Sequence, residues 1–326
     1  MVALSLRVST ALLGVLLTAG CASVAPTVDE EDDAGAPRTT DSPSAPAAPP
    51  AEASPAPPPP PPPPQLPRGG RELFPTHRLV GFSGAPGSQA LGRLTGDLDA
   101  AAAQLEPLAA EYAAGRRPLP VFELIATVVH DRPGADGTYR TRVGDEVVQQ
   151  YLDAARRHRA LLLLNLQPGL VDFLPEVQSY ERWLREPDVS VALDPEWAVE
   201  PGQVPGRAYG RTTGAELDGV AAYLSSLVAQ GDLPEKPLVF HQVAPQVVEA
   251  PELLQPHPGV QLIRSVDGIG VPAEKVATWT RITTGQPPHV RGGFKLFFEE
   301  DTERGPLMTS PEVLALVPQP EYVLFE

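Results

Sequence analysis

From residue 71 to the end, short apolar runs alternate with amphipathic stretches. The runs are rich in β-branched residues, which is typical of strands buried in a parallel sheet. The stretches between them place apolar residues on one face of a helix. The expected strands are Leu79–Ser83, Val121–Val129, Leu161–Gln167, Val189–Asp194, Leu238–Gln242, Gln261–Val266, Gly293–Glu299 and Tyr322–Phe325.

The helical signals differ in strength. The clearest helix runs from Leu217 to Val228, with a capping box at Thr213–Glu216 and Gly231 at its end. A proline in a first turn predicts another helix start at Ser310-Pro311. Further helices are expected over residues 98–112 and 147–155, weaker ones over 173–184 and 273–282, and a single turn over 251–254.

Eight strands that alternate with helices over about 255 residues predict a (β/α)8 barrel spanning residues 71–326. The alternative is a doubly wound open sheet. Its usual sign is a glycine-rich turn after the first strand, and Gly84-Ala-Pro-Gly87 does not match that pattern. The sequence therefore favours the barrel.

The connections between the expected elements are uneven in length. Those that lead from strand to helix are long, namely 131–144, 198–212 and 301–309, whereas residues 187–188 suffice to lead from a helix back to a strand. In a barrel the long connections share one face, which carries the active site.

The first twenty residues have the layout of a signal peptide, with Arg7 near the start, an apolar stretch over 11–17 and small residues at 19–20. This stretch is shorter than the roughly 20 apolar residues of a membrane-spanning helix. The segment Leu17–Cys21 resembles the lipobox of bacterial lipoproteins, with Thr18 where leucine is usual. The resemblance implies an exported protein, held by an acylated (palmitate-bearing) Cys21 in the lipid bilayer at the outer face of the cell membrane. The alternative is an ordinary secretory signal followed by a chance cysteine.

The segment 21–70 differs in composition from the rest of the chain. It holds an acidic run over 28–33 and eight consecutive prolines, Pro57–Pro64, with few large apolar residues. Such a segment is expected to be disordered, and its prolines to form a stiff polyproline II spacer. Partner binding by the prolines is the alternative. Cys21 is the only cysteine, so the folded domain must be stable without a disulfide.

The charge balance limits the partners. The chain has 41 acidic and 25 basic residues, a net charge of −16. Nucleic-acid binding calls for a basic face, so it is not expected, and neither is electrostatic docking on anionic lipid. No nucleotide or flavin motif is present, so no cofactor is predicted, and we expect a monomer. The scarcity of lysine beside abundant Arg, Ala, Gly and Pro resembles an actinobacterial protein.

Polar residues gather near the ends of the expected strands. Side chains alternate along a strand, so Lys295, Phe297 and Glu299 should share the inward phase of the seventh strand. Asp194 and Glu196 share a phase at the end of the fourth. The other polar candidates are Glu123 on the second strand and His130 just beyond it, Asn165 and Gln167 on the third, His241 on the fifth and Asp267 after the sixth.

This arrangement resembles the (β/α)8 glycoside hydrolases. One large group of these enzymes has its two catalytic carboxyls at the ends of strands 4 and 7. The resemblance to this group implies that Glu196 is the acid/base and Glu299 the nucleophile. Pro195 stands where that group usually has asparagine, but other barrel glycosidases carry an Asp-x-Glu pair, which Asp194-Pro195-Glu196 matches. Glycoside cleavage needs one protonated carboxyl and one ionised carboxylate.

Asp194 is expected to keep its neighbour Glu196 protonated, since close like charges raise a carboxyl pKa. Trp197 and Tyr209 are candidates for stacking on sugars. The candidates for binding hydroxyls and other polar groups of the substrate are His130, Asn165, Gln167, His241 and Asp267.

Structural roles compete with these assignments. Glu123 and Lys295 lie deeper in their strands and are expected to form a buried ion pair or polar layer. Trp197 could equally pack in the core, Asp267 could open a turn, and the acidic run Glu299–Asp301 could be a solvated strand end.

Three functions remain open. The first is hydrolysis of envelope or environmental glycans, and the second is a non-catalytic barrel that binds a glycan or a protein partner. The third is a metal-dependent enzyme using Asp194, Glu196, His241 and Glu299, although no His-x-His or HExxH motif is present and no metal is predicted. A glycerophosphodiesterase is disfavoured because Gly81-Phe-Ser-Gly84 stands where that family has His-Arg-Gly.

Overall fold

The structure is a computed structural model that describes residues 62–326. The expected signal peptide, Cys21 and the acidic part of the expected stalk lie outside the described residues. In the described part of the chain, no helix combines the length and the apolar character that crossing a bilayer requires.

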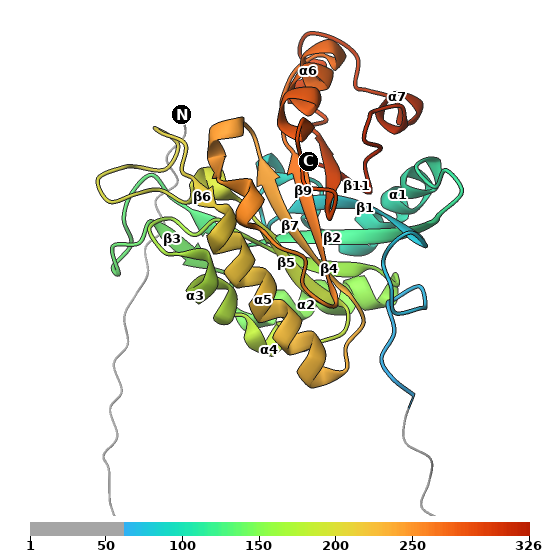
Figure 1. The fold of residues 1–326 in the computed structure, drawn as a ribbon, viewed down its shortest axis with the longest axis horizontal. Coiled ribbons are helices and arrows are strands. Elements are labelled where there is room, and N and C mark those ends of the chain that lie inside the picture. The colour runs from blue at the N-terminus through green and yellow to red at the C-terminus, as the bar shows by residue number, and fades with distance from the viewer. Residues whose placement is uncertain (1–61) are drawn as a thin grey trace, which may run out of the picture. The chain divides into compact units, whose positions relative to one another are not determined.

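Eight parallel strands close into a barrel (Figure 1). Each strand pairs with the next along the chain, and the last pairs with the first, Tyr322 lying opposite Leu79. The strands are β1 (His77–Gly84), β2 (Arg117–Val129), β4 (Leu161–Leu166), β5 (Val189–Leu193), β7 (Lys236–Gln242), β9 (Val260–Val266), β10 (Val290–Leu296) and β11 (Tyr322–Phe325). The predicted (β/α)8 barrel is confirmed, and the open sheet is excluded.

The helices cover the outside of the barrel (Figure 1). They are α1 (Leu98–Glu111), α2 (Asp145–Arg157), α3 (Phe173–Gln178), α4 (Glu181–Leu184), α5 (Gly214–Gly231), α6 (Pro272–Thr283) and α7 (Ser310–Leu314). Short 3-10 turns are η1 (Gln89–Leu91), η2 (Pro195–Trp197), η3 (Pro245–Val247), η4 (Pro251–Leu253) and η5 (Glu300–Thr302). The stretch 173–184, expected as one helix, is divided into α3 and α4.

Local sequence explains where the main helices begin. Thr213 caps α5 by accepting the backbone N–H of Glu216 at 3.1 Å, as predicted. Thr309, rather than the expected Ser310, caps α7, because its hydroxyl and backbone N–H both donate to Glu312. Outward strand residues pack with the helices in one large apolar core that includes Phe122, Leu164 and Leu224.

The inward side chains of the strands form two layers. At the end where the strands begin, the layer is apolar, with contributions such as Leu79, Val121 and Ile263. Leu66, Leu73 and Phe74 belong to the same cluster and fill that end of the barrel; we call these three the plug residues. Leu66 is 2% exposed, so packing against the domain starts within the segment for which the sequence predicts a stalk.

Where the strands end, the inward layer is polar. Glu123, Asn165, His241 and Lys295 lie in it, and all are buried. Gly293 makes room for a neighbour in this layer, because a Cβ there would lie 3.2 Å from a ring carbon of Tyr322. The Tyr322 ring therefore fits beneath the polar layer with its hydroxyl pointing up into it.

The first long connection is a hairpin rather than an open loop. β3 (Arg140–Arg142) pairs antiparallel with the end of β2. The pairing of β2 with β4 shifts between Ile125 and Thr127, so Thr127 turns outward and its hydroxyl donates to Glu176 of α3 at 2.8 Å. Elsewhere, β6 (Thr212–Thr213) and β8 (Val248–Glu249) form a small parallel pair.

Candidate functional site

His241 lies at the centre of the polar layer. Its Nδ1 is 2.8 Å from Asp267 Oδ2, and its Nε2 is 2.9 Å from Glu123 Oε1. Burial opposes charge on this imidazole, but the carboxylates of Asp267 and Glu123 hold the pKa of His241 well above its usual value. His241 is therefore an imidazolium that donates to a carboxylate on each side.

The two carboxylates stay ionised for the same reason. Burial alone would raise their pKa values, but the charge of His241 outweighs it and lowers the pKa of Glu123, and lowers that of Asp267 to about 2. Tyr322 donates to Glu123 Oε2 at 2.6 Å, and Ser265 donates to Asp267 Oδ1 at 2.9 Å. Every carboxylate oxygen of this group thus has a donor.

Lys295 forms ion pairs with two carboxylates of the polar layer. Its Nζ is 2.7 Å from Glu326 Oε2 and 3.4 Å from Asp267 Oδ2. Burial works against the ammonium, but these two carboxylates hold the pKa of Lys295 well above its usual value. The expected buried polar layer of Glu123 and Lys295 is present, with His241 and Asp267 between them.

Asp194 joins the layer from the end of β5. Asn165 donates to its Oδ1 at 3.1 Å, and Gln167 donates to its Oδ2 at 3.2 Å. His241 Nε2 lies 3.9 Å from Oδ1. Burial raises the pKa of Asp194, with the charge of His241 acting in the opposite direction. Its surroundings nevertheless offer donors to both oxygens, so they accommodate an ionised carboxylate.

Glu196 differs from every other carboxyl of the layer. It lies in η2, 8% exposed, and its Oε2 is buried without a hydrogen-bond partner. Burial, followed by the nearby charges of Asp194 and Asp267, raises the pKa of Glu196 to about 8. Glu196 is therefore protonated at neutral pH beside carboxylates that carry charge.

These groups enclose a cavity of about 220 Å³ at the ends of the strands, which we call the mouth cavity. Its polar lining consists of Ser83, Glu123, Asn165, Gln167, Asp194, Glu196, Asp267, Lys295 and Glu326. Its apolar lining consists of Leu91, Ile125, Trp197, Tyr209, Val243, Ile269 and Phe297. Polar groups that orient a ligand within apolar walls are characteristic of small-molecule sites.

A second hollow, of about 420 Å³, adjoins the mouth cavity, and we call it the outer groove. It is lined by Glu196, Trp197, Gly206, Arg207, Ala208 and Tyr209. Glu196, Trp197 and Tyr209 line both hollows. The loop after η2 is fixed to the site, because Gly210 donates to the Glu196 carbonyl at 2.6 Å and Arg211 donates to that of Ala198 at 3.0 Å.

Seven of the predicted site residues come together as expected. Asn165, Gln167, Asp194, Glu196, Trp197, Tyr209 and Asp267 line the mouth cavity. His241 lies directly behind this lining, where it contacts Glu123, Asp267 and Asp194.

Glu299 lies apart from this group. β10 ends at Leu296, and Glu299 precedes η5, so the alternation that predicted an inward Glu299 stops before it is reached. Its exposed side chain lines another groove with Arg93 and Phe298, and Glu326 borders both that groove and the mouth cavity. The structure therefore does not bring Glu196 and Glu299 into one cavity, as the sequence had led us to expect.

His130 is also displaced from the mouth cavity. The irregularity in β2 after Ile125 changes the phase of the strand, and the hairpin carries His130 outward. Its exposed ring contacts the Thr141 hydroxyl at 2.9 Å.

Three polar residues of the site were missed from the sequence, namely Ser83, Tyr322 and Glu326. Extending the search for polar strand ends to the first and eighth strands would have found Ser83 and Glu326, whereas Tyr322 begins its strand and gives no such signal. Glu326 lies just beyond β11, and Ser83 donates to its Oε2 at 3.1 Å.

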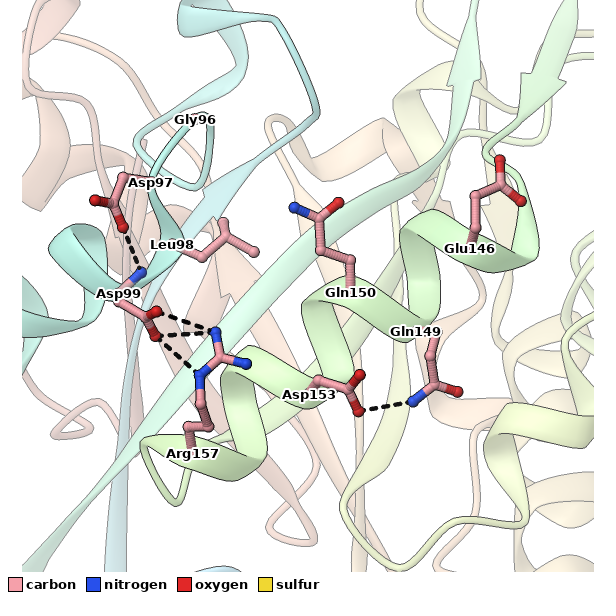
Figure 2. Close-up of a pocket in the computed structure, with 9 residues that line it drawn as sticks. All are labelled: Gly96, Asp97, Leu98, Asp99, Glu146, Gln149, Gln150, Asp153 and Arg157. Atoms are coloured by element: carbon pink, nitrogen blue, oxygen red, sulfur yellow. Dashed lines mark hydrogen bonds and ion pairs between the residues drawn. The ribbon is translucent and has the colours of Figure 1, made fainter.

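Another polar depression, of about 550 Å³, lies on the helices between the start of α1 and α2 (Figure 2). Arg157 there donates to Asp99 at 3.0 Å, and Gln149 donates to Asp153 at 2.8 Å. Its polar side chains are all exposed, so nothing there resembles the buried carboxyl of Glu196. Within residues 62–326, no three His, Cys, Asp or Glu side chains are arranged to hold a metal ion.

Comparisons with known proteins do not show a family for this chain. No family model matches the chain, and no curated protein matches its sequence. Two of the solved structures that resemble it weakly illustrate how remote the similarity is. The spore coat polysaccharide biosynthesis protein SpsE from Bacillus subtilis has 11% identity over 76% of this chain, with a TM-score of 0.36, and the chain covers 58% of its length. A GH18 chitinase from Pseudoalteromonas aurantia has 10% identity over 76% of this chain and 93% of its own, with a TM-score of 0.29.

Proposed function

We propose that the barrel hydrolyses glycosidic bonds, with Glu196 as the proton donor. The observation that carries this proposal is the state of Glu196, a buried carboxyl whose pKa is raised to about 8 and which borders two adjoining hollows. A general acid must hold a proton at working pH and meet the leaving group in a site that excludes bulk water.

Asp194 is the second carboxyl in this proposal, in place of Glu299. Asn165 and Gln167 donate to it, which supports the ionised form. In the reaction, Glu196 protonates the glycosidic oxygen, and the bond from that oxygen to C1 breaks with its electron pair on the oxygen. Asp194 stabilises the positive charge that develops at C1, and water then adds its oxygen to C1 and returns a proton to Glu196.

Replacing Glu196→Gln tests the assignment, with Glu299→Gln as the matched control. We expect Glu196→Gln to lower turnover of natural glycans roughly 10²- to 10⁴-fold, and Glu299→Gln to leave it unchanged. On dinitrophenyl glycosides, whose leaving group needs no proton, Glu196→Gln should retain most of its activity. Wild-type activity on natural glycans should fall as the pH rises above about 8. Equal turnover by wild type and Glu196→Gln on natural glycans would contradict the proposal.

A non-catalytic glycan-binding barrel is the second candidate. The pairing of almost all inward polar groups with one another favours it, because paired groups bind a ligand less strongly. Measuring binding and hydrolysis on the same glycan panel separates the two functions. Binding by the wild type without any cleavage would favour this candidate.

A further inference from the structure

Glu196 lies where the mouth cavity meets the outer groove. If Glu196 donates the proton, the bond that breaks must cross this junction, with one sugar on each side. The two sides differ in chemistry, because Asp194 lines the mouth cavity and is absent from the lining of the outer groove.

This difference sets the direction of the substrate. Positive charge develops on C1 of the sugar on the non-reducing side of the bond, so that sugar belongs beside Asp194 in the mouth cavity. The sugar on the reducing side, whose oxygen receives the proton and which is the leaving group, then belongs in the outer groove. The rest of the glycan is therefore attached on the reducing-end side of the bond.

The mouth cavity limits how many sugars fit on the non-reducing side of the bond. Its floor consists of Glu123 and Lys295, above the apolar layer that fills the barrel. Its volume of about 220 Å³ is about half that of the outer groove, and the polar layer closes it below, so it suits a single sugar ring. The residue in the cavity must therefore be the non-reducing terminus of the chain.

The outer groove is open by contrast. Every residue from Gly206 to Tyr209 is exposed, and Tyr209 is 63% exposed. An exposed aromatic ring beside an acid is suited to packing against the apolar face of the leaving sugar. Its position leaves the remainder of a long glycan free to extend into solvent.

We infer that the enzyme acts on chain ends, removing one residue at a time from the non-reducing terminus of a glycan whose next sugar packs on Tyr209. This inference rests on the proposed function. It names the substrate class as unbranched non-reducing ends and assigns Tyr209 to specificity rather than to catalysis.

The test uses oligosaccharides of four to six residues, labelled at the reducing end, from any glycan that the wild type hydrolyses. The expected products are the monosaccharide and a chain shortened by one residue, from the earliest time point. Chains that carry a bulky benzyl ether on the non-reducing terminal residue should resist cleavage. Early release of fragments of two or more residues, or cleavage of the blocked chains, would overturn the inference.

Tyr209→Ala tests the outer groove separately. We expect KM for the oligosaccharides to rise about two- to twelvefold with kcat unchanged, and Tyr209→Phe to behave like the wild type. Unchanged KM in Tyr209→Ala would remove the role assigned to Tyr209. Failure of the proposed function has a different signature, since the wild type would then hydrolyse no glycan and the inference would fall with it.

Discussion

Replacing Glu196 by glutamine should make the protein more stable, increasingly so as the pH rises. Folding raises the Glu196 pKa from 4.5 to about 8, so the folded state holds a proton that the unfolded state has lost. A carboxyl of this kind contributes stability that declines as the pH rises from the lower to the higher value. Glutamine has nearly the same shape and never ionises, so it lacks this decline.

The magnitude follows from the two pKa values. At about 1.4 kcal/mol for each pKa unit, the wild type should lose roughly 2–3 kcal/mol relative to Glu196→Gln between pH 5 and pH 7. Between pH 5 and pH 9 the loss should reach roughly 4 kcal/mol. Glu196 is buried, so solvent screening reduces these figures little, and loss of its proton would also leave Oε2 charged without a donor.

Urea unfolding at pH 5, 7 and 9, followed by tryptophan fluorescence, measures the effect. The control is Glu299→Gln, whose exposed side chain should give a curve parallel to that of the wild type at every pH. Parallel curves for wild type and Glu196→Gln from pH 5 to pH 9 would refute the reasoning. They would mean that Glu196 ionises in the folded protein as readily as in water, and so is not the proton donor.

Two further predictions concern other parts of the chain. His241→Gln removes the cation between Glu123 and Asp267, so the free energy of unfolding should fall by about 3–5 kcal/mol at pH 7. Urea unfolding measures this loss. As a control, His130→Gln at an exposed position should stay within about 0.5 kcal/mol of the wild type. An unchanged free energy of unfolding for His241→Gln would argue against a charged His241. Cys21→Ser should abolish incorporation of labelled palmitate in the expressing bacterium and release the protein from the membrane fraction. Labelling that survives this substitution would show that the anchor, if any, lies elsewhere.

The barrel could be predicted well from the sequence because the composition of each strand shows that the strand is buried. A parallel strand covered on both faces must be apolar along its length, and runs such as Leu161–Leu166 leave few alternatives. Polar residues inside such runs were equally informative. Asn165 and His241 interrupt apolar strands, and both proved to belong to the polar layer.

The errors arose where regular alternation stopped. Glu299 was placed by extending the phase of β10 beyond its last residue, and His130 by extending that of β2 through an irregular pairing. Neither the end of a strand nor a shift in its pairing follows from local sequence, because both depend on contacts with distant residues. The Lys295 carbonyl near the end of β10, for example, accepts a hydrogen bond from Lys275 of α6 at 2.9 Å.

The plug residues have a mechanical consequence. Leu66, Leu73 and Phe74 enter the barrel at the end opposite the mouth cavity, so residues 62–65, which precede them, join the domain on the far side from Glu196. A pull on that preceding chain would act first on Leu66 and the apolar layer, with the whole length of the barrel between the point of force and the polar layer.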